Sequence, residues 1–313
     1  MGNDLTVIMY HYVRQLEETR YPAIKARRTS EFRFQVHHIK NNYHPVTILD
    51  VVNCVRTGDP LPPKAVLLTF DDGYIDHYVN VFPILFDAGI QGAFFPPVAP
   101  ISRAELLDFN RIHFALAAER NHEELGEFLD QEIRAYRQEY SLKSPEDYRT
   151  EWTKPNRFDL AETIYVKRML QVVLPEGLRN IISRKLFARF VSVDEVSFCA
   201  ELYCTTAQLK LMQASGMYVG SHGDSHCWLN AVDDATQRQE IENSLEFLRG
   251  IGSPVDDHWV MCYPYGAWNE PLLSTLREYR CSVGFTTEFG TAQLGINNPL
   301  LLPRLDTNDI PVG

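Results

Sequence analysis

The sequence predicts an α/β fold, namely a distorted or incomplete (β/α) barrel of about seven strands with a large helical insertion. Two observations favour this fold. Short apolar runs alternate with helix-like segments at both ends of the chain, and polar side chains directly follow several of these runs. In parallel barrels, residues that carry chemistry lie at the carboxyl ends of the strands.

The first half of the barrel is expected between residues 5 and 95. The apolar run Ala65–Leu68 predicts a buried strand, which ends in the adjacent carboxylates of Asp71 and Asp72. Because helices separate the strands, we expect parallel pairing with right-handed crossovers. The predicted strands are 5–10, 43–49, 65–70 and 92–95, and the predicted helices begin near residues 30, 50 and 74.

Residues 101–200 have a different character, because Glu, Gln, Arg and Leu dominate there. We expect several amphipathic helices, inserted into a single catalytic domain that spans residues 1–313. Without them about 210 residues remain, near the lower limit of about 200 for such a barrel. The barrel pattern resumes with predicted helices at 205–212, 235–248 and 270–279 and strands at 217–220, 259–263, 282–286 and 300–305.

Composition limits the classes of partner and compartment. The net charge of −11 argues against nucleic acid and against anionic lipid surfaces. No apolar segment reaches the roughly 18 residues that span a bilayer. The N-terminus lacks the basic region of a signal peptide, so a cytoplasmic protein is expected. Six scattered cysteines without a Cys-x-x-Cys pair predict reduced thiols. The composition does not predict an oligomeric state.

One carboxylate and two histidines form a candidate metal site. Asp71-Asp72-Gly73 is by itself also typical of a turn. His222 and His226 are four residues apart, which on one helical turn would place both imidazoles on one face. Together with Asp72 they would leave coordination positions open, as catalytic zinc sites do. Gly223 stands where zinc peptidases have glutamate, which disfavours that mechanism.

Three motifs in this order resemble the polysaccharide deacetylases of the chitooligosaccharide-deacetylase homology group. They are Thr69–Gly73, Ser221–His226 and Tyr263–Gly266, and the resemblance covers the chain except for the insertion. It implies a TIM-like barrel and a metal-dependent carbohydrate N-deacetylase. Asp72, His222 and His226 would hold a divalent metal, usually zinc.

The resemblance also implies catalytic roles. Asp71 would act as the general base, and the backbone N–H of Tyr265 would stabilise the oxyanion. The arginine that many members carry before Pro-Tyr is replaced here by Cys262 and Tyr263, and a late histidine motif is absent after residue 258.

Two residues could fill these gaps. His11, in Met9-Tyr10-His11, matches the circularly permuted motif order of some members and would then protonate the leaving amine. Arg304 is a candidate to orient Asp71. The alternative role of His11 is that of a buried structural histidine, and the alternative for Arg304 is an ordinary salt bridge.

These features predict a hydrolase that removes the acetyl group from an N-acetylated sugar or glycan precursor and releases acetate. One alternative is hydrolysis of another non-peptide C–N bond, such as a cyclic amide or ureide. Another is a non-catalytic carbohydrate-binding relative, although a binder needs no base beside a metal. The insertion at 101–200 is expected to cap the site, and the sugar and its linkage are not predicted.

Overall fold

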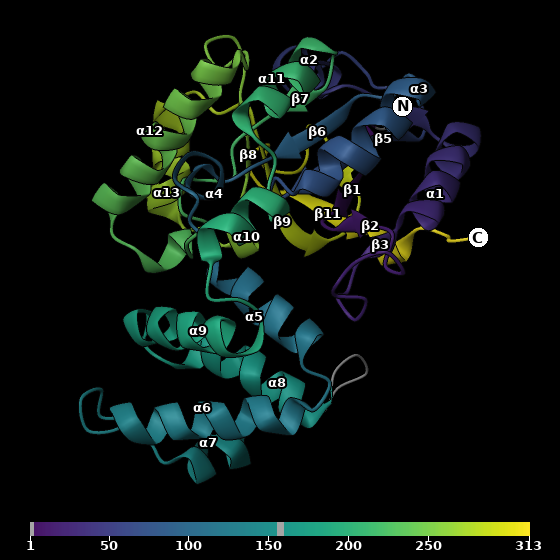
Figure 1. Ribbon diagram of the computed structural model, residues 1–313. Coiled ribbons are helices and arrows are strands. Elements are labelled where there is room, and N and C mark those ends of the chain that lie inside the picture. The colour runs from purple at the N-terminus through teal and green to yellow at the C-terminus, as the bar shows by residue number, and fades with distance from the viewer. Residues whose placement is uncertain (1–2, 155–159) are drawn as a thin grey trace. The chain divides into compact units, whose positions relative to one another are not determined.

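The computed structural model describes residues 3–154 and 160–313. They form two compact units (Figure 1). Unit 1 contains the described residues up to Gln15 together with Ala26–Glu105 and Cys199–Gly313. Unit 2 contains Leu16–Lys25 and the described part of Leu106–Phe198. That residues 101–200 are an insertion within one catalytic domain stays a prediction.

Unit 1 contains the strands. They are β1 (Asp4–Tyr10), β2 (Val13–Arg14), β3 (Arg27–Arg28), β4 (His44–Pro45), β5 (Ala65–Asp71), β6 (Gly92–Phe95), β7 (Tyr218–Val219), β8 (Val260–Cys262), β9 (Val283–Phe289), β10 (Ala292–Gln293) and β11 (Leu302–Asp306). The main sheet runs in the order β7-β6-β5-β1-β11-β9-β8, with β4 beside β5 and β10 beside β1. All neighbours along this path are parallel.

The two end strands of this path meet and close a distorted barrel. Ser221, just beyond β7, pairs with Met261 of β8. Its N–H donates to the carbonyl of Val260 at 3.0 Å, and its carbonyl accepts from the N–H of Cys262 at 2.8 Å. The predicted barrel of about seven strands is therefore confirmed, and a single bridging residue completes the ring.

Helices cover the outer face of the barrel in unit 1 (Figure 1). Because side chains alternate along a strand, Leu68 and Phe70 of β5 point outward into this layer, whereas Ala65 and Leu67 point inward. The helices are α1 (Thr29–Asn42), α2 (Ile48–Thr57), α3 (Phe82–Ala88) after a π-helical turn (His77–Val81), α4 (Val98–Arg103), α11 (Thr206–Ala214), α12 (Asp234–Ile251) and α13 (Glu270–Glu278).

Helix α2 packs against the inward-facing residues at the beginning of the strands. Its Val51 and Val52 share an apolar cluster with Leu5, Ala65 and Leu67. The same inward row of β5 continues with Thr69 and Asp71, both of which are buried. The barrel interior is therefore apolar where the strands begin and polar where they end.

The predicted strand at 43–49 is wrong, because only His44–Pro45 pairs with β5. The reason is a strong helix start at Thr47. The Thr47 hydroxyl accepts from the N–H of Asp50, and the Asp50 carboxylate accepts from the N–H of Thr47. This capping box begins α2 at Ile48 and ends the strand early.

The described part of Leu106–Phe198 in unit 2 is mostly helical, whereas Leu16–Lys25 contains no helix. The helices of unit 2 are α5 (Asp108–Ala118), α6 (His122–Tyr136), α7 (Pro145–Trp152), α8 (Ala161–Arg168), a π-helical turn (Met169–Val173), α9 (Glu176–Phe190) and α10 (Glu195–Leu202), within which the chain returns to unit 1. A separate apolar cluster lies within this unit and includes Leu129, Tyr165 and Ile182, which are fully buried.

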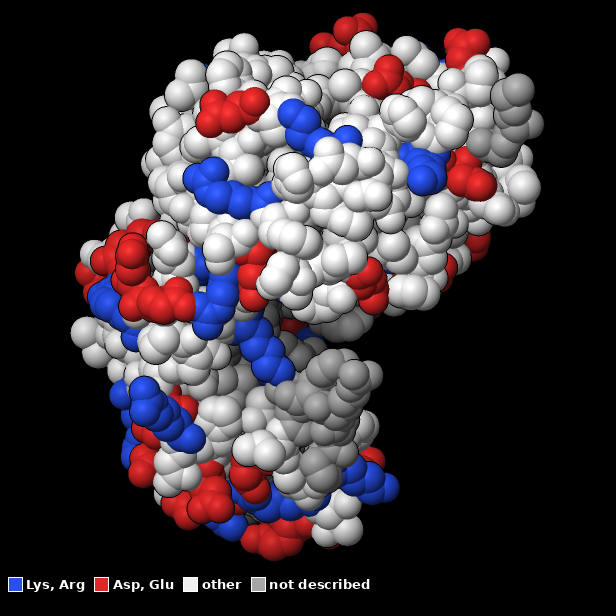
Figure 2. Space-filling model, turned by 90° about the vertical axis from the view of Figure 1, so that its right-hand side faces the viewer, with Lys and Arg blue, Asp and Glu red and all other residues white. Residues whose placement is uncertain are grey.

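Charged side chains of both signs are intermingled on the face seen in Figure 2. The predicted lack of nucleic-acid binding remains a prediction. Within residues 3–154 and 160–313, none of the helices has the length and hydropathy that crossing a bilayer requires.

Candidate active site

The carboxyl end of β5 places the two adjacent aspartates in different surroundings. Asp71 is the last residue of the strand and points into the barrel. Asp72 has a left-handed φ of 73°, and its N–H donates to the carbonyl of Phe95 on β6 at 3.1 Å. A φ in this region is strained for a residue with a side chain. The turn separates the carboxylates, so each meets its own set of partners.

Asp72 lies against both predicted histidines. Its Oδ1 is 3.4 Å from Nε2 of His222 and 3.4 Å from Nε2 of His226. One ligand atom from each of the three residues lies within 4.8 Å of the others, and all three residues are buried. The structure therefore brings together the three side chains that the sequence proposed as metal ligands.

The chemistry of these atoms fits a cation. Nδ1 of His222 lies 2.6 Å from the carbonyl of Cys262, and since a carbonyl can only accept, Nδ1 must donate. In the neutral ring Nε2 then presents its lone pair to the carboxylate oxygen of Asp72. Histidine ligands of metals are commonly oriented by such a second hydrogen bond. The set could hold a divalent metal, with Asp72, His222 and His226 as ligands.

The histidines do not lie on a helical turn, so this part of the prediction is wrong. Residues 222–228 form a loop, in which Gly223 and His226 have positive φ values of 74° and 61°. Glu240 of α12 explains why the loop is not helical. Its Oε2 accepts from the N–H groups of Asp224 at 2.7 Å and Ser225 at 2.9 Å, which satisfies backbone donors that a helix would otherwise pair.

Arg304 of β11 holds Asp71 from inside the barrel. Its Nη1 donates to Asp71 Oδ1 at 3.0 Å and its Nη2 to Oδ2 at 2.8 Å. Nη1 also reaches the Thr69 hydroxyl at 3.1 Å, and Nε donates to the carbonyl of Thr286 at 2.8 Å. Burial alone would raise the pKa of Asp71, but the positive charge of Arg304, with smaller contributions from His222 and His11, lowers it to about 2.

His11 stands at the mouth of the site, just after β1. Its Nε2 is 4.0 Å from Asp71 Oδ2, and its side chain is 43% exposed. The buried ring of His77 donates from Nε2 to the His11 carbonyl at 2.9 Å and so supports this position. His11 is therefore near the carboxylate and open to solvent, unlike a buried structural histidine.

Tyr265 lies on the turn after β8, with φ 58° and ψ 9°. Its ring stacks on Trp228, with centroids 4.3 Å apart and an interplanar angle of 6°, and meets the ring of His226 edge-on at 4.7 Å. The ring of Tyr265 is therefore in contact with the candidate metal ligand His226, and the role of its backbone N–H stays a prediction.

Two residues of the site are not among the predicted site residues. They are Glu240 and Tyr74, whose hydroxyl donates to Asp72 Oδ2 at 2.9 Å. A signal for Glu240 was present. Gln237, Glu240 and Ser244 recur at helical spacing on the same side of α12 as its buried apolar residues, and all three are buried. Polar side chains on a core-facing stripe generally require partners.

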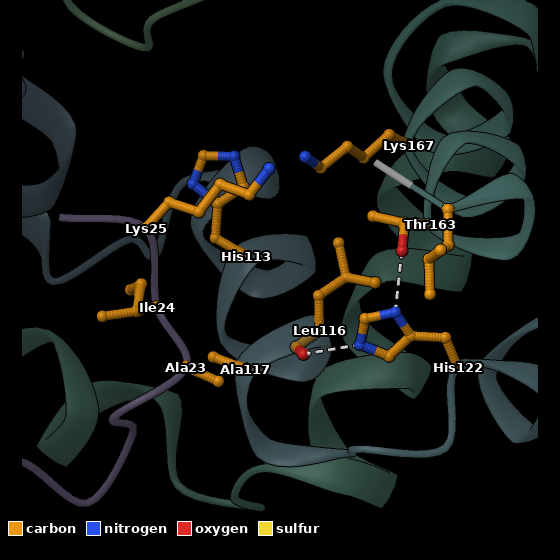
Figure 3. A pocket seen from close by; sticks show the side chains of 10 residues that line it. Ala23, Ile24, Lys25, His113, Leu116, Ala117, His122, Thr163 and Lys167 are labelled. Carbon is orange, nitrogen blue, oxygen red and sulfur yellow. Dashed lines mark hydrogen bonds between the residues drawn. The ribbon is translucent and has the colours of Figure 1, made fainter. Parts of the chain in front are cut away.

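A pocket of about 330 Å³ lies within unit 2 and contains no predicted site residue among the described residues that line it (Figure 3). Both ring nitrogens of His122 are engaged there, Nε2 with the Leu116 carbonyl at 3.0 Å and Nδ1 with the Thr163 hydroxyl at 2.7 Å. His122 is therefore a structural residue, and the site in unit 1 remains the candidate for chemistry.

A distorted parallel barrel with an Asp/His/His set at the carboxyl ends of its strands is typical of metal-dependent hydrolases. Comparison with known proteins gives matches over part of the chain. A family model described as "Polysaccharide deacetylase" matches residues 189–284. The chain is 42% identical over 85 residues to the poly-beta-1,6-N-acetyl-D-glucosamine N-deacetylase of Escherichia coli (strain K12). That match covers 26% of this chain and 12% of the relative's length.

Two solved structures share the fold over almost the whole chain. The Streptococcus pyogenes deacetylase PplD in complex with acetate has a TM-score of 0.59 at 16% identity and covers 98% of this chain and 93% of its own. IcaB from Ammonifex degensii has a TM-score of 0.58 at 18% identity, with the same coverage of 98% and 93%. Residues 189–284 of the chain thus resemble the polysaccharide deacetylases in sequence, and the solved structures share its fold.

Proposed function

We propose that this protein is a metal-dependent N-deacetylase that hydrolyses the acetamido group of an amino sugar in a glycan or glycan precursor. The observation that carries the proposal is the convergence of Asp72 Oδ1 with Nε2 of both His222 and His226 beside the Arg304-held Asp71. A binding protein has no need for a second, separately held carboxylate at a metal site. Zinc is the proposed metal, because two imidazoles and one carboxylate with open positions suit it.

The proposed metal ligands are Asp72, His222 and His226. A divalent ion bound there would polarise the acetamide carbonyl and lower the pKa of an attacking water molecule. Asp71 takes a proton from that water, and Arg304 keeps Asp71 pointing into the barrel while it does so. Because the fork of Arg304 binds both carboxylate oxygens, the base cannot rotate away from the reacting atoms.

Two further groups complete the proposed mechanism. The backbone N–H of Tyr265 donates to the oxygen that becomes negatively charged when water adds to the carbonyl. His11 gives a proton to the amine nitrogen, so that the C–N bond breaks into acetate and a free amino sugar. Its exposure at the mouth of the site suits a group that must reach the leaving nitrogen of a bound glycan.

The substrate proposed first is an oligomer that contains N-acetyl-D-glucosamine. The printed name of the E. coli relative gives this sugar. The match to the family model, residues 189–284, contains His222, His226 and Tyr265. A cytoplasmic location, and hence a precursor rather than a finished polymer as substrate, stays a prediction.

The test is acetate release by the purified full chain. The protein is stripped with a chelator, reloaded with Zn²⁺ or other divalent metals, and incubated with β-1,4- and β-1,6-linked N-acetylglucosamine oligomers. The matched control is Asp71→Asn, which keeps the ligand residues and removes the base. Acetate release by the zinc-loaded wild type and not by D71N is the expected result.

Two outcomes would reject the proposal. Hydrolysis of a cyclic amide or ureide without acetate release from any sugar would point to the alternative C–N hydrolase. Glycan binding by a protein that takes up no metal would point to a non-catalytic carbohydrate-binding relative.

A further inference from the structure

Tyr74 makes a direct contact with the proposed metal ligand Asp72. Its hydroxyl donates to Asp72 Oδ2 at 2.9 Å. Tyr74 is 0% exposed and Asp72 1% exposed, so water does not compete for this bond. A hydrogen bond to a buried charged group contributes more than one between exposed neutral groups.

The two oxygens of Asp72 therefore have separate partners. Oδ1 faces Nε2 of His222 and His226 at 3.4 Å each, whereas Oδ2 is held by Tyr74. Rotation of the carboxylate about its Cβ–Cγ bond would break the Tyr74 hydrogen bond. The bond consequently favours the one orientation in which Oδ1 points to both imidazoles.

The position of the Tyr74 ring is fixed independently of Asp72. Its ring stacks on Tyr12, with centroids 4.0 Å apart and an interplanar angle of 19°, and lies near-parallel to Tyr203 at 5.9 Å. The N–H of Cys204 donates to the carbonyl of Gly73 at 2.9 Å, and Tyr74 and Tyr203 form an antiparallel bridge. Segment 203–204 thus clamps the turn that carries Asp72.

We infer that Tyr74 is a positioning residue, which holds Asp72 with Oδ1 toward His222 and His226 and thereby increases the affinity of this site for a divalent metal. The inference rests on the proposed function, since it takes these three residues as metal ligands. Groups that hydrogen-bond to a metal ligand typically change metal affinity by about 10- to 100-fold when they are removed.

The test compares Tyr74→Phe with Tyr10→Phe in the full chain. Y74F removes only the hydroxyl and keeps the stacked ring. Y10F removes another buried hydroxyl of unit 1, from a ring that packs on Phe32 and Phe70. Zinc affinity is measured on metal-free protein by competition with a chromophoric chelator, and the Co²⁺-loaded proteins are compared by visible absorption.

We expect Y74F to bind zinc about 10-fold or more weakly and to change the Co²⁺ spectrum, while Y10F matches the wild type in both. A second variant, Tyr203→Leu, loosens the clamp but keeps the Tyr74 hydroxyl, and it should also weaken zinc binding. Y203L takes the place of Y74F in the test if Y74F shows no cooperative thermal unfolding.

The inference would be overturned if Y74F had the zinc affinity and the Co²⁺ spectrum of the wild type. If Y74F does not fold, the same result for Y203L would overturn it. The outcome for the proposed function is separate. A wild type that binds zinc, with weaker binding in Y74F, but releases no acetate from any sugar would retain the role of Tyr74 and reject the deacetylase. A wild type that binds no zinc would reject both.

Discussion

Arg304 and Asp71 form a buried ion pair with two hydrogen bonds, which joins β11 to β5 across the barrel interior. Nη1 and Nη2 of Arg304 lie 3.0 and 2.8 Å from Oδ1 and Oδ2 of Asp71. The arginine comes from a part of the chain more than 200 residues away from the aspartate, and both side chains are buried. Asp71 is thus held in one orientation by a buried partner.

Replacing Arg304 with lysine keeps the charge and removes the fork, because an ammonium group cannot bind both carboxylate oxygens in the planar geometry of a guanidinium. We expect kcat for acetate release to fall by about 100-fold, since a small displacement of a catalytic group has such an effect. Zinc affinity of R304K serves as the control and should equal that of the wild type. A wild-type kcat in R304K would show that the fork does not orient the base.

The Asp71 carboxyl should also make stability depend on pH. Its pKa in the folded protein is about 2, below the ordinary value of about 3.9, so folding favours the charged form. The stabilisation is therefore present above pH 4 and is lost as the pH falls through 2, by on the order of 2 kcal/mol. Urea unfolding of the metal-free protein at pH 4, 3 and 2 measures it.

The control for this pH dependence is Asp71→Asn, which cannot titrate. D71N leaves the Arg304 charge unpaired and should be less stable than the wild type at every pH. Between pH 4 and pH 2, however, its free energy of unfolding should decrease less steeply. Equal slopes for the two proteins would contradict the assignment of a low pKa to Asp71.

The sequence predicts the barrel because its signals are local. The apolar run Ala65–Leu68 followed by Asp71 and Asp72 requires only that a buried strand reach the surface, and the structure has this strand. The shape of the histidine loop is not local. It depends on Glu240, which is 14 residues after His226 and accepts the N–H groups of Asp224 and Ser225.

The difference between local and long-range contacts also explains which single-residue features could be predicted. The Thr47–Asp50 capping box lies within four residues and is readable in the sequence, yet the predicted strand at 43–49 runs past it. The contact between Tyr74 and Asp72 also lies within three residues. It could not be predicted, because it depends on the stacking of Tyr74 between Tyr12 and Tyr203 from distant segments.

Replacing His11 with alanine should abolish turnover while metal binding remains. His11 is 4.0 Å from Asp71 and is not among the three residues grouped around Asp72 Oδ1. Loss of a general acid reduces the rate by about 10²- to 10⁴-fold. The measurements are acetate release with zinc at saturation and zinc affinity by chelator competition.

His37→Ala is the matched control for this variant, because His37 is an exposed histidine on α1. H37A should retain full activity. Added imidazole should restore part of the activity of H11A and none of the activity of D71N. Normal turnover by H11A would remove His11 from the mechanism.

Glu240→Gln should destabilise the loop that carries both histidines. Oε2 of Glu240 accepts two backbone N–H groups and Oε1 accepts the Ser225 hydroxyl at 2.5 Å, whereas an amide offers one oxygen only. We expect a loss of roughly 1–3 kcal/mol in the free energy of unfolding, because a buried donor is left without its partner. Urea unfolding of the metal-free protein measures this loss.

Zinc affinity of E240Q should fall as well, since the loop sets the positions of His222 and His226. Glu246→Gln, on the exposed side of the same helix, is the control and should change neither quantity. If E240Q were destabilised but bound zinc like the wild type, the loop would be held together by Glu240 without being oriented by it.

Two glycines should respond in opposite ways to replacement by alanine. Gly266 follows Tyr265 and has φ 68°, and a methyl group there would collide with the Thr287 hydroxyl and lie 2.9 Å from the Thr287 backbone nitrogen. Both strain and collision predict that G266A loses roughly 1–3 kcal/mol of stability. Because the neighbouring N–H of Tyr265 must shift, acetate release should fall as well.

Gly250 is the matched case, near the end of α12, where an added Cβ would meet no atom within 4 Å. Alanine has a higher helix propensity than glycine, so G250A should gain about 0.5–1 kcal/mol and leave activity unchanged. Urea unfolding of both variants at pH 7 measures the difference. A G266A protein as stable and active as G250A would contradict this prediction, because the turn after β8 would then accept the added methyl group without displacing the N–H of Tyr265.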